Sequence, residues 1–238
     1  MALGVVTLEE IRTELRQRID RVNSEFFTDE ELNSYISGSY KELYDILIQK
    51  FGDDYYVAQP YEFTTDGTSD TYDLPEDFYK LLGVDCQLNG SDNGNGWVTL
   101  RQFMFQERNA YTLPNYQSFY GITNLRYRLR DNSLWLTPIP MGGQLMRIFY
   151  IPRPATLVDD ADTVDGVSGW QEYIICDAAI KCMVKEESDP SAFAAQKMAV
   201  LQRIESAAEN RNAGQPQTVS DVHQSFWPYG GWGPGNNY

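Results

Sequence analysis

Residues 26–52, FFTDEELNSYISGSYKELYDILIQKFG, carry the most complete set of helix signals in the chain. Thr28 and Glu31 have the spacing of a capping box, which satisfies free amides at a helix N-terminus. Apolar residues then recur every three or four positions up to Phe51, and Gly52 is suited to end a helix. The stretch predicts one long amphipathic helix, whose apolar stripe needs a partner.

A second helix is expected just before it. Thr7 and Glu10 form another capping-box pattern, and apolar residues follow at helical spacing. These residues are Leu8, Ile11, Leu15, Ile19 and Val22. We therefore expect residues 1–54 to form an antiparallel helical hairpin.

Helical signals return near the other end of the chain. Ser168 and Gln171 have capping-box spacing before WQEYIICDAAIKCMVKEES, and Asp189 with Pro190 is a typical helix start before SAFAAQKMAVLQRIESAAENRNA. We expect residues 161–212 to form a second helical hairpin.

Between the hairpins, residues 55–160 change to a period of two. The stretch NLRYRLRDNSLWLTPIP, residues 124–140, alternates apolar and polar side chains around an Asp131-Asn132 turn. YEFTT and TYDL flank an Asp66-Gly67 turn and predict a hairpin. About five or six antiparallel strands are expected. The predicted fold is thus α+β, a four-helix bundle formed by the two hairpins, with an inserted antiparallel β domain and an extended tail.

Composition limits the possible functions. The 238 residues carry a formal net charge of −15, which argues against a protein that grips phosphate backbones. The one histidine, His223, lies outside every predicted element, so histidine-dependent catalysis is disfavoured. Cys86, Cys176 and Cys182 match no metal spacing and indicate reduced thiols. No run approaches the roughly 20 apolar residues of a membrane span, and the N-terminus lacks the features of a signal peptide.

Three features of the sequence are candidate sites. The acidic loop VDDADTVDG, residues 158–166, fails the EF-hand pattern and is expected to be solvated. Paired carboxylates could hydrolyse glycosides, but no pair stands out among 34 acidic residues. Arg126, Arg128 and Arg130 share one face of a strand and could contact an anion, although pairing with acidic residues of a neighbouring strand or subunit is favoured. No catalytic, cofactor-binding or metal-binding residue is predicted.

Residues 213–238 end in QSFWPYGGWGPGNNY and show no periodicity. Glycine and proline oppose regular structure, whereas aromatic side chains are common anchors at protein interfaces. We expect this tail to dock on another protein through its aromatic residues. These are Phe226, Trp227, Tyr229, Trp232 and Tyr238.

Three stretches resemble the head-to-tail adaptor (connector) proteins of tailed bacteriophages, of the type found in short-tailed phages. They are LPEDFYKLLGVD with WVTLRQFMFQERNAY, then RLRDNSLWLTPIP, and then residues 169–222. The resemblance implies a structural virion protein at the head-tail junction, made in the cytoplasm of the host bacterium. It implies a ring of usually twelve copies between a portal protein and a tail or nozzle protein. DNA would pass through the ring without specific binding.

Two other functions stay open at this point. Some adaptors of short-tailed phages are linked to cell-wall hydrolysis, so the resemblance also allows a muramidase-like virion component. A nucleic-acid-binding regulator is the third possibility, although the net charge disfavours it. The resemblance implies no cofactor and assigns no catalytic residue.

Overall fold

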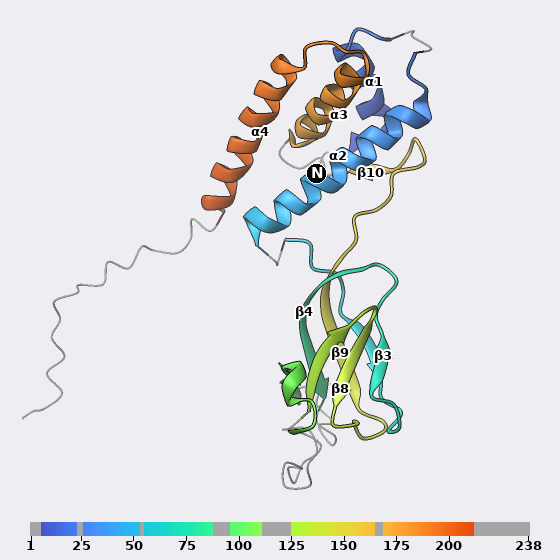
Figure 1. Ribbon diagram of the computed structural model, residues 1–238, viewed down its shortest axis with the longest axis vertical. Coiled ribbons are helices and arrows are strands. Elements are labelled where there is room, and N and C mark those ends of the chain that lie inside the picture. The colour runs from blue at the N-terminus through green and yellow to red at the C-terminus, as the bar shows by residue number, and fades with distance from the viewer. Residues whose placement is uncertain are drawn as a thin grey trace, which may run out of the picture.

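A computed structural model describes residues 6–22, 26–52, 55–87, 96–110, 125–164 and 169–211. The molecule is elongated, with four helices at one end and β-sheets at the other (Figure 1). The helices are α1 (Leu8–Arg18), α2 (Asp29–Phe51), α3 (Gln171–Lys185) and α4 (Ser191–Glu209).

The N-terminal caps of α1 and α2 follow the sequence signals, whereas α3 begins after Trp170 and α4 after Pro190, neither of which provides a side-chain cap. At α1 the full capping box forms, because the Glu10 amide donates to Thr7 Oγ1 and the Thr7 amide donates to Glu10 Oε2. At α2, Thr28 Oγ1 accepts the Glu31 amide at 3.2 Å, but the Glu31 carboxylate binds Lys185 of α3 instead of returning to the cap. The second box is therefore only half formed, and its acid joins two helices.

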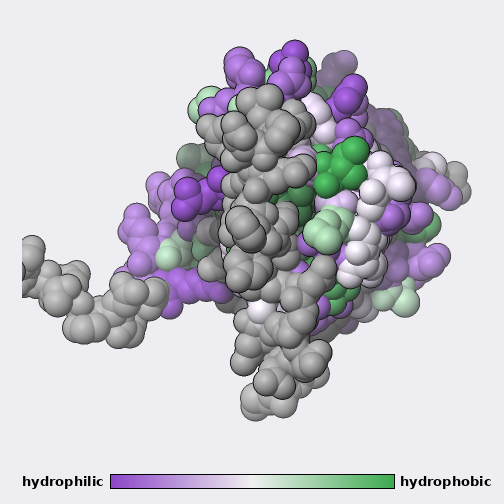
Figure 2. All heavy atoms as spheres, turned by 90° about the horizontal axis from the view of Figure 1, so that it is seen from below, coloured by the Kyte–Doolittle hydropathy of each residue, from purple (hydrophilic) through white to green (hydrophobic). Residues whose placement is uncertain are grey.

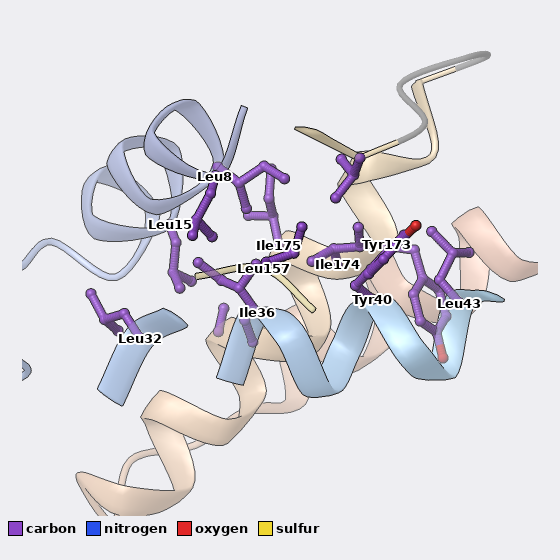
Figure 3. Packing of buried hydrophobic residues seen from close by; sticks show 14 of the residues in the cluster. Leu8, Leu15, Leu32, Ile36, Tyr40, Leu43, Leu157, Tyr173, Ile174 and Ile175 are labelled. Atoms are coloured by element: carbon purple, nitrogen blue, oxygen red, sulfur yellow. The ribbon is translucent and has the colours of Figure 1, made fainter. Parts of the chain in front are cut away.

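The helical core is built around α3, whose residues Tyr173, Ile174 and Ile175 are buried in one cluster with residues of α1 and α2 (Figure 3). Leucines of α1 and the apolar stripe of α2 meet there, as the helical spacing predicted. By contrast, α4 places only Val200 and Ile204 among the buried residues. It packs on α2 and α3 along a narrow stripe.

A two-stranded sheet completes the helical end. β1 (Val6–Thr7) and β10 (Thr163–Val164) pair antiparallel, and the Leu8 amide donates to the Asp162 carbonyl. Residues that are far apart in the sequence are thus joined at the start of α1.

The β end contains two four-stranded sheets. One has the order β2 (Tyr61–Thr64), β9 (Leu145–Pro152), β4 (Phe78–Gln87), β5 (Trp97–Thr99). The other has the order β3 (Thr71–Asp73), β8 (Ser133–Thr137), β7 (Arg126–Arg130), β6 (Arg101–Gln102), and a short 3-10 turn, η1 (Phe105–Glu107), follows β6. One hydrophobic cluster draws on both sheets, including Val84 and Ile148 from the first and Leu134 and Leu136 from the second. The sheets therefore enclose a shared core.

The expected four-helix bundle with one inserted antiparallel domain is wrong. The described residues contain ten strands in three sheets, of which one lies at the helical end. β6 and β7 run parallel, so the second sheet is mixed. Two-residue strands such as β1 and β10 carry no periodic signal, and parallel pairing depends on the path of the connecting chain rather than on local pattern.

The predicted hairpin around Asp66-Gly67 is also wrong, whereas the one around Asp131-Asn132 is confirmed. β2 pairs with β9 and β3 pairs with β8, so the strands that flank Gly67 enter different sheets. β7 and β8 do pair directly across the second turn. Local turn residues identify a change of direction but not the strand that will be paired.

The helical and β ends contact each other through α2. Tyr44 and Ile48 of α2 are buried with Ile151 of β9 in a small cluster. The Tyr44 hydroxyl donates to the Pro152 carbonyl at 2.7 Å, and the Tyr79 hydroxyl donates to Asp45 Oδ1 at 2.6 Å. These contacts fix the last part of α2 against the sheet.

Candidate functional site

The aromatic tail that the sequence singled out lies outside the described residues. This applies to Phe226, Trp227, Tyr229, Trp232 and Tyr238, whose role in binding a partner stays a prediction.

The described part contains one closely linked polar cluster inside the helical end. Asp177 of α3 is 4% exposed, and its carboxylate lies 2.5 Å from Lys197 Nζ of α4 and 2.7 Å from Lys181 Nζ. Ser39 of α2 places its Oγ 2.7 Å from the same carboxylate. Three helices are therefore joined through one buried carboxylate.

The charges of this cluster stabilise the packing of the three helices. Burial raises the pKa of Asp177, but hydrogen bonds from Lys181, Lys197 and Ser39 outweigh it and hold the pKa below its ordinary value. Lys181 Nζ lies 3.0 Å from Ser39 Oγ, which is the arrangement of a serine–lysine catalytic pair. However, Ser39 is fully buried, so no substrate could reach its hydroxyl. Of this cluster, only the Asp177–Lys181 pair could be read from the sequence, because the two residues are four positions apart on one helix.

The outer face of the β3–β8–β7–β6 sheet carries a concentration of arginine. Arg126, Arg128 and Arg130 pair with Thr137, Trp135 and Ser133 of β8, which places them on one face as the alternation predicted. β6 adds Arg101 beside Arg126, and Arg108 follows directly after η1.

Aromatic side chains lie among these arginines. The Arg108 guanidinium is 4.6 Å from the centre of the Phe105 ring, and Phe105 in turn lies 6.3 Å from the Trp135 ring. A depression of about 520 Å³ opens here, lined by Phe105, Arg108, Arg128, Leu129, Arg130, Asp131 and Trp135. The sequence identified the β7 arginines, but the contribution of η1 and Trp135 depends on tertiary structure.

For Arg128 and Arg130, the expected pairing with acids of a neighbouring strand is not seen within the described residues. Arg101, Arg108, Arg128 and Arg130 form no ion pair there. The Arg128 guanidinium donates to the Phe103 carbonyl at 3.3 Å instead. Within the described residues, these four guanidinium groups are thus available to bind an anionic group of another molecule. We call Arg101, Arg108, Arg128, Arg130, Phe105 and Trp135 the arginine face.

In the described part of the acidic loop, Val158, Asp159 and Asp160 are exposed, as expected of a solvated segment, and its carboxylates also make specific contacts. Asp162 Oδ2 accepts the amides of Val158 at 2.6 Å and Asp159 at 2.9 Å, and Asp160 pairs with Arg12 at 2.8 Å. Across the described ranges, no group of His, Cys, Asp or Glu is arranged to hold a metal ion. The loop therefore closes against α1 through its own carboxylates.

The three cysteines are buried, and none of them forms a disulfide. Burial raises the pKa of the Cys86 thiol to about 11, and burial also raises the pKa of Cys182 to about 12. A protonated, buried thiol is a poor nucleophile. The two cysteines of α3, Cys176 and Cys182, are core residues.

Exposed apolar side chains occur at several places. Hydrophobic groups lie among hydrophilic ones on the surface seen from the β end (Figure 2). Met104, Phe105, Ile139 and Met141 are all at least half exposed.

None of the helices described is long and apolar enough to cross a membrane.

The chain matches a family of known proteins. A family model described as SU10 adaptor protein matches residues 6–221, which includes both the helical and the β end. No curated protein matches the chain.

Proposed function

The chain belongs to the SU10 adaptor protein family, and from this membership we propose that it forms a ring joining the portal to the tail of a phage virion. Its membership in this family identifies the chain as a phage structural adaptor protein. The ring, its usual twelve copies and its position around the DNA channel are our proposal.

The observation that carries the proposal is the extent of the family match, from residue 6 to residue 221. The elongated shape supports it, because two chemically different ends can contact two different neighbours (Figure 1). The charge distribution supports it as well. Most of the 34 acidic residues lie outside residues 55–154, so the helical end is strongly acidic. An acidic lumen would repel phosphates and let DNA slide.

The aromatic tail is proposed as the anchor on the portal or on an adjacent tail component. Residues 213–238 could span roughly 85 Å if fully extended, which is enough to reach beyond a neighbouring copy. Burying one aromatic side chain contributes about 1.5–3 kcal/mol, and many tails in one ring add avidity. Phe226, Trp227 and Trp232 are the main anchors in this proposal.

The decisive experiment is electron microscopy of the purified protein with and without the portal of the same phage. Because acidic copies repel one another, we expect the isolated chain to be largely monomeric at low salt and to form rings on the portal. Failure to bind the portal at any salt concentration would exclude the adaptor role. A zymogram on peptidoglycan tests the absence of enzymatic activity, and a clearing band would indicate a hydrolase instead.

A further inference from the structure

The arginine face lies on a sheet whose opposite edge is acidic. β3 forms that edge, and it carries Asp73, followed in the next turn by Glu76. Both side chains are exposed, and neither has an ion pair within the part of the chain that the structure describes. We call Asp73 and Glu76 the acidic edge.

The ladder register keeps the two charges apart within one molecule. Asp73 pairs with Ser133, and Ser133 pairs with Arg130, so the acid and the arginine lie on one face with a strand between them. Two strand spacings put their Cα atoms about 10 Å apart, and within the described residues no ion pair joins Asp73 to Arg130. Each charge is therefore free to pair with a different molecule.

The composition of the arginine face is that of a protein interface. Arginine, tryptophan and phenylalanine are enriched in interfaces, whereas lysine is depleted, and every basic residue here is arginine. Phe105 is 50% exposed beside Arg108, so it can be covered together with the arginines. A guanidinium binds a carboxylate through two parallel hydrogen bonds, which gives such a contact a defined orientation.

We propose that the arginine face receives the acidic edge of a second copy of this chain. The inference rests on the proposed ring and names a contact between its subunits. Two different surfaces at opposite edges of one sheet make a heterologous interface, which closes into a ring when the rotation between copies is right. Duplex DNA is the other possible occupant, and the exposed aromatic ring of Phe105 among the arginines favours a protein partner over a phosphate backbone.

Disulfide trapping tests the contact without requiring a ring. Asp73→Cys chains and differently tagged Arg130→Cys chains are mixed at high concentration under mild oxidation. The native cysteines are buried and will not compete. We expect the mixed disulfide to exceed either homodimer at least tenfold, and a Lys41→Cys chain mixed with Arg130→Cys to give no such excess. Equal amounts of mixed and like pairs would overturn the proposal.

Charge reversal tests the same contact during assembly on the portal. Arg130→Glu and Asp73→Arg should each reduce assembly about tenfold or more, and the double variant should recover most of it because the pair is restored with its charges exchanged. Lys41→Glu, an exposed site on α2 with the same charge change as Arg130→Glu, should assemble normally. Normal assembly of both single variants would overturn the proposal.

The outcomes separate this inference from the adaptor role. If the wild-type chain does not bind the portal but the mixed disulfide still forms, the proposed function fails and the subunit contact stands. If the portal ring forms and Arg130→Glu leaves it intact, the proposed function stands and the subunit contact is refuted. Loss of duplex DNA binding in Arg130→Glu at about 0.15 M salt, with assembly unchanged, would assign the face to nucleic acid and refute our proposal.

Discussion

Replacing Asp177 by Asn should destabilise the helical end substantially. The carboxylate accepts from Lys181, Lys197 and Ser39 while it is almost fully buried. Asparagine has nearly the same shape but no charge. Among the described residues, the two ammonium groups would keep only Glu42 as a counter-ion, which lies 3.5 Å from Lys181 and 3.6 Å from Lys197.

The magnitude follows from the geometry. Removing one partner of a buried ion pair costs roughly 3–5 kcal/mol. Both lysine side chains are partly exposed, by 30% and 24%, so water recovers some of the loss. We expect the free energy of unfolding to fall by about 3 kcal/mol. In a chain of this size that corresponds to a decrease in Tm of about 6–12 °C.

The assay is urea denaturation followed by far-ultraviolet circular dichroism at several pH values. The pKa of Asp177 is lowered in the folded protein, so its contribution is present above the ordinary value of 3.8 and is lost as pH falls through the lower folded pKa. The difference between wild type and Asp177→Asn should therefore be full near pH 7 and should shrink as the pH drops below 3.8.

The matched control is Asp73→Asn, the same chemical change at an exposed site without an ion pair in the described chain. It should change the free energy of unfolding by less than about 0.5 kcal/mol. An equally small effect in Asp177→Asn, or a large effect that persists unchanged at pH 2, would refute the reasoning about the buried carboxylate.

Three other predictions concern the caps, the β end and the tail. Thr28→Ala removes the side-chain cap of α2 and should lower the free energy of unfolding by about 1 kcal/mol in urea denaturation, with Thr13→Ala as an exposed control. Gly67→Ala should cost more than about 1 kcal/mol, because φ is +81° and the new Cβ would lie 2.8 Å from the Gly142 nitrogen; an unchanged Tm would contradict this. Deleting residues 225–238 should leave the Tm unchanged but sharply weaken portal binding in a pull-down, and full binding by the truncated chain would exclude the tail as anchor.

The local elements of this protein were largely predictable from its sequence. The Thr7 and Thr28 caps and the apolar stripes of α1 and α2 depend on residues within a few positions of one another, and the structure confirms them. The β7–β8 hairpin was predictable for the same reason, since a short turn forces its flanking strands together.

The candidate sites were only partly predictable. The alternation of Arg126, Arg128 and Arg130 placed them on one face, because side chains in a strand alternate strictly. Their approach to Arg108 and Phe105 could not be read from the sequence, because β6 and η1 reach β7 only through a long connection. The Asp177 cluster was missed because Ser39 and Lys197 come from other helices.

The sequence by itself determined where α1 and α2 begin, which residues of α2 face inward and that the chain is strongly acidic. Only the tertiary structure decided that β2 and β3 enter different sheets, that β1 pairs with β10 and that β6 runs parallel to β7. The physical reason is the range of the interactions. Caps and periodic stripes are set by neighbouring residues, whereas strand partners are chosen by which apolar faces can be buried together across the whole chain.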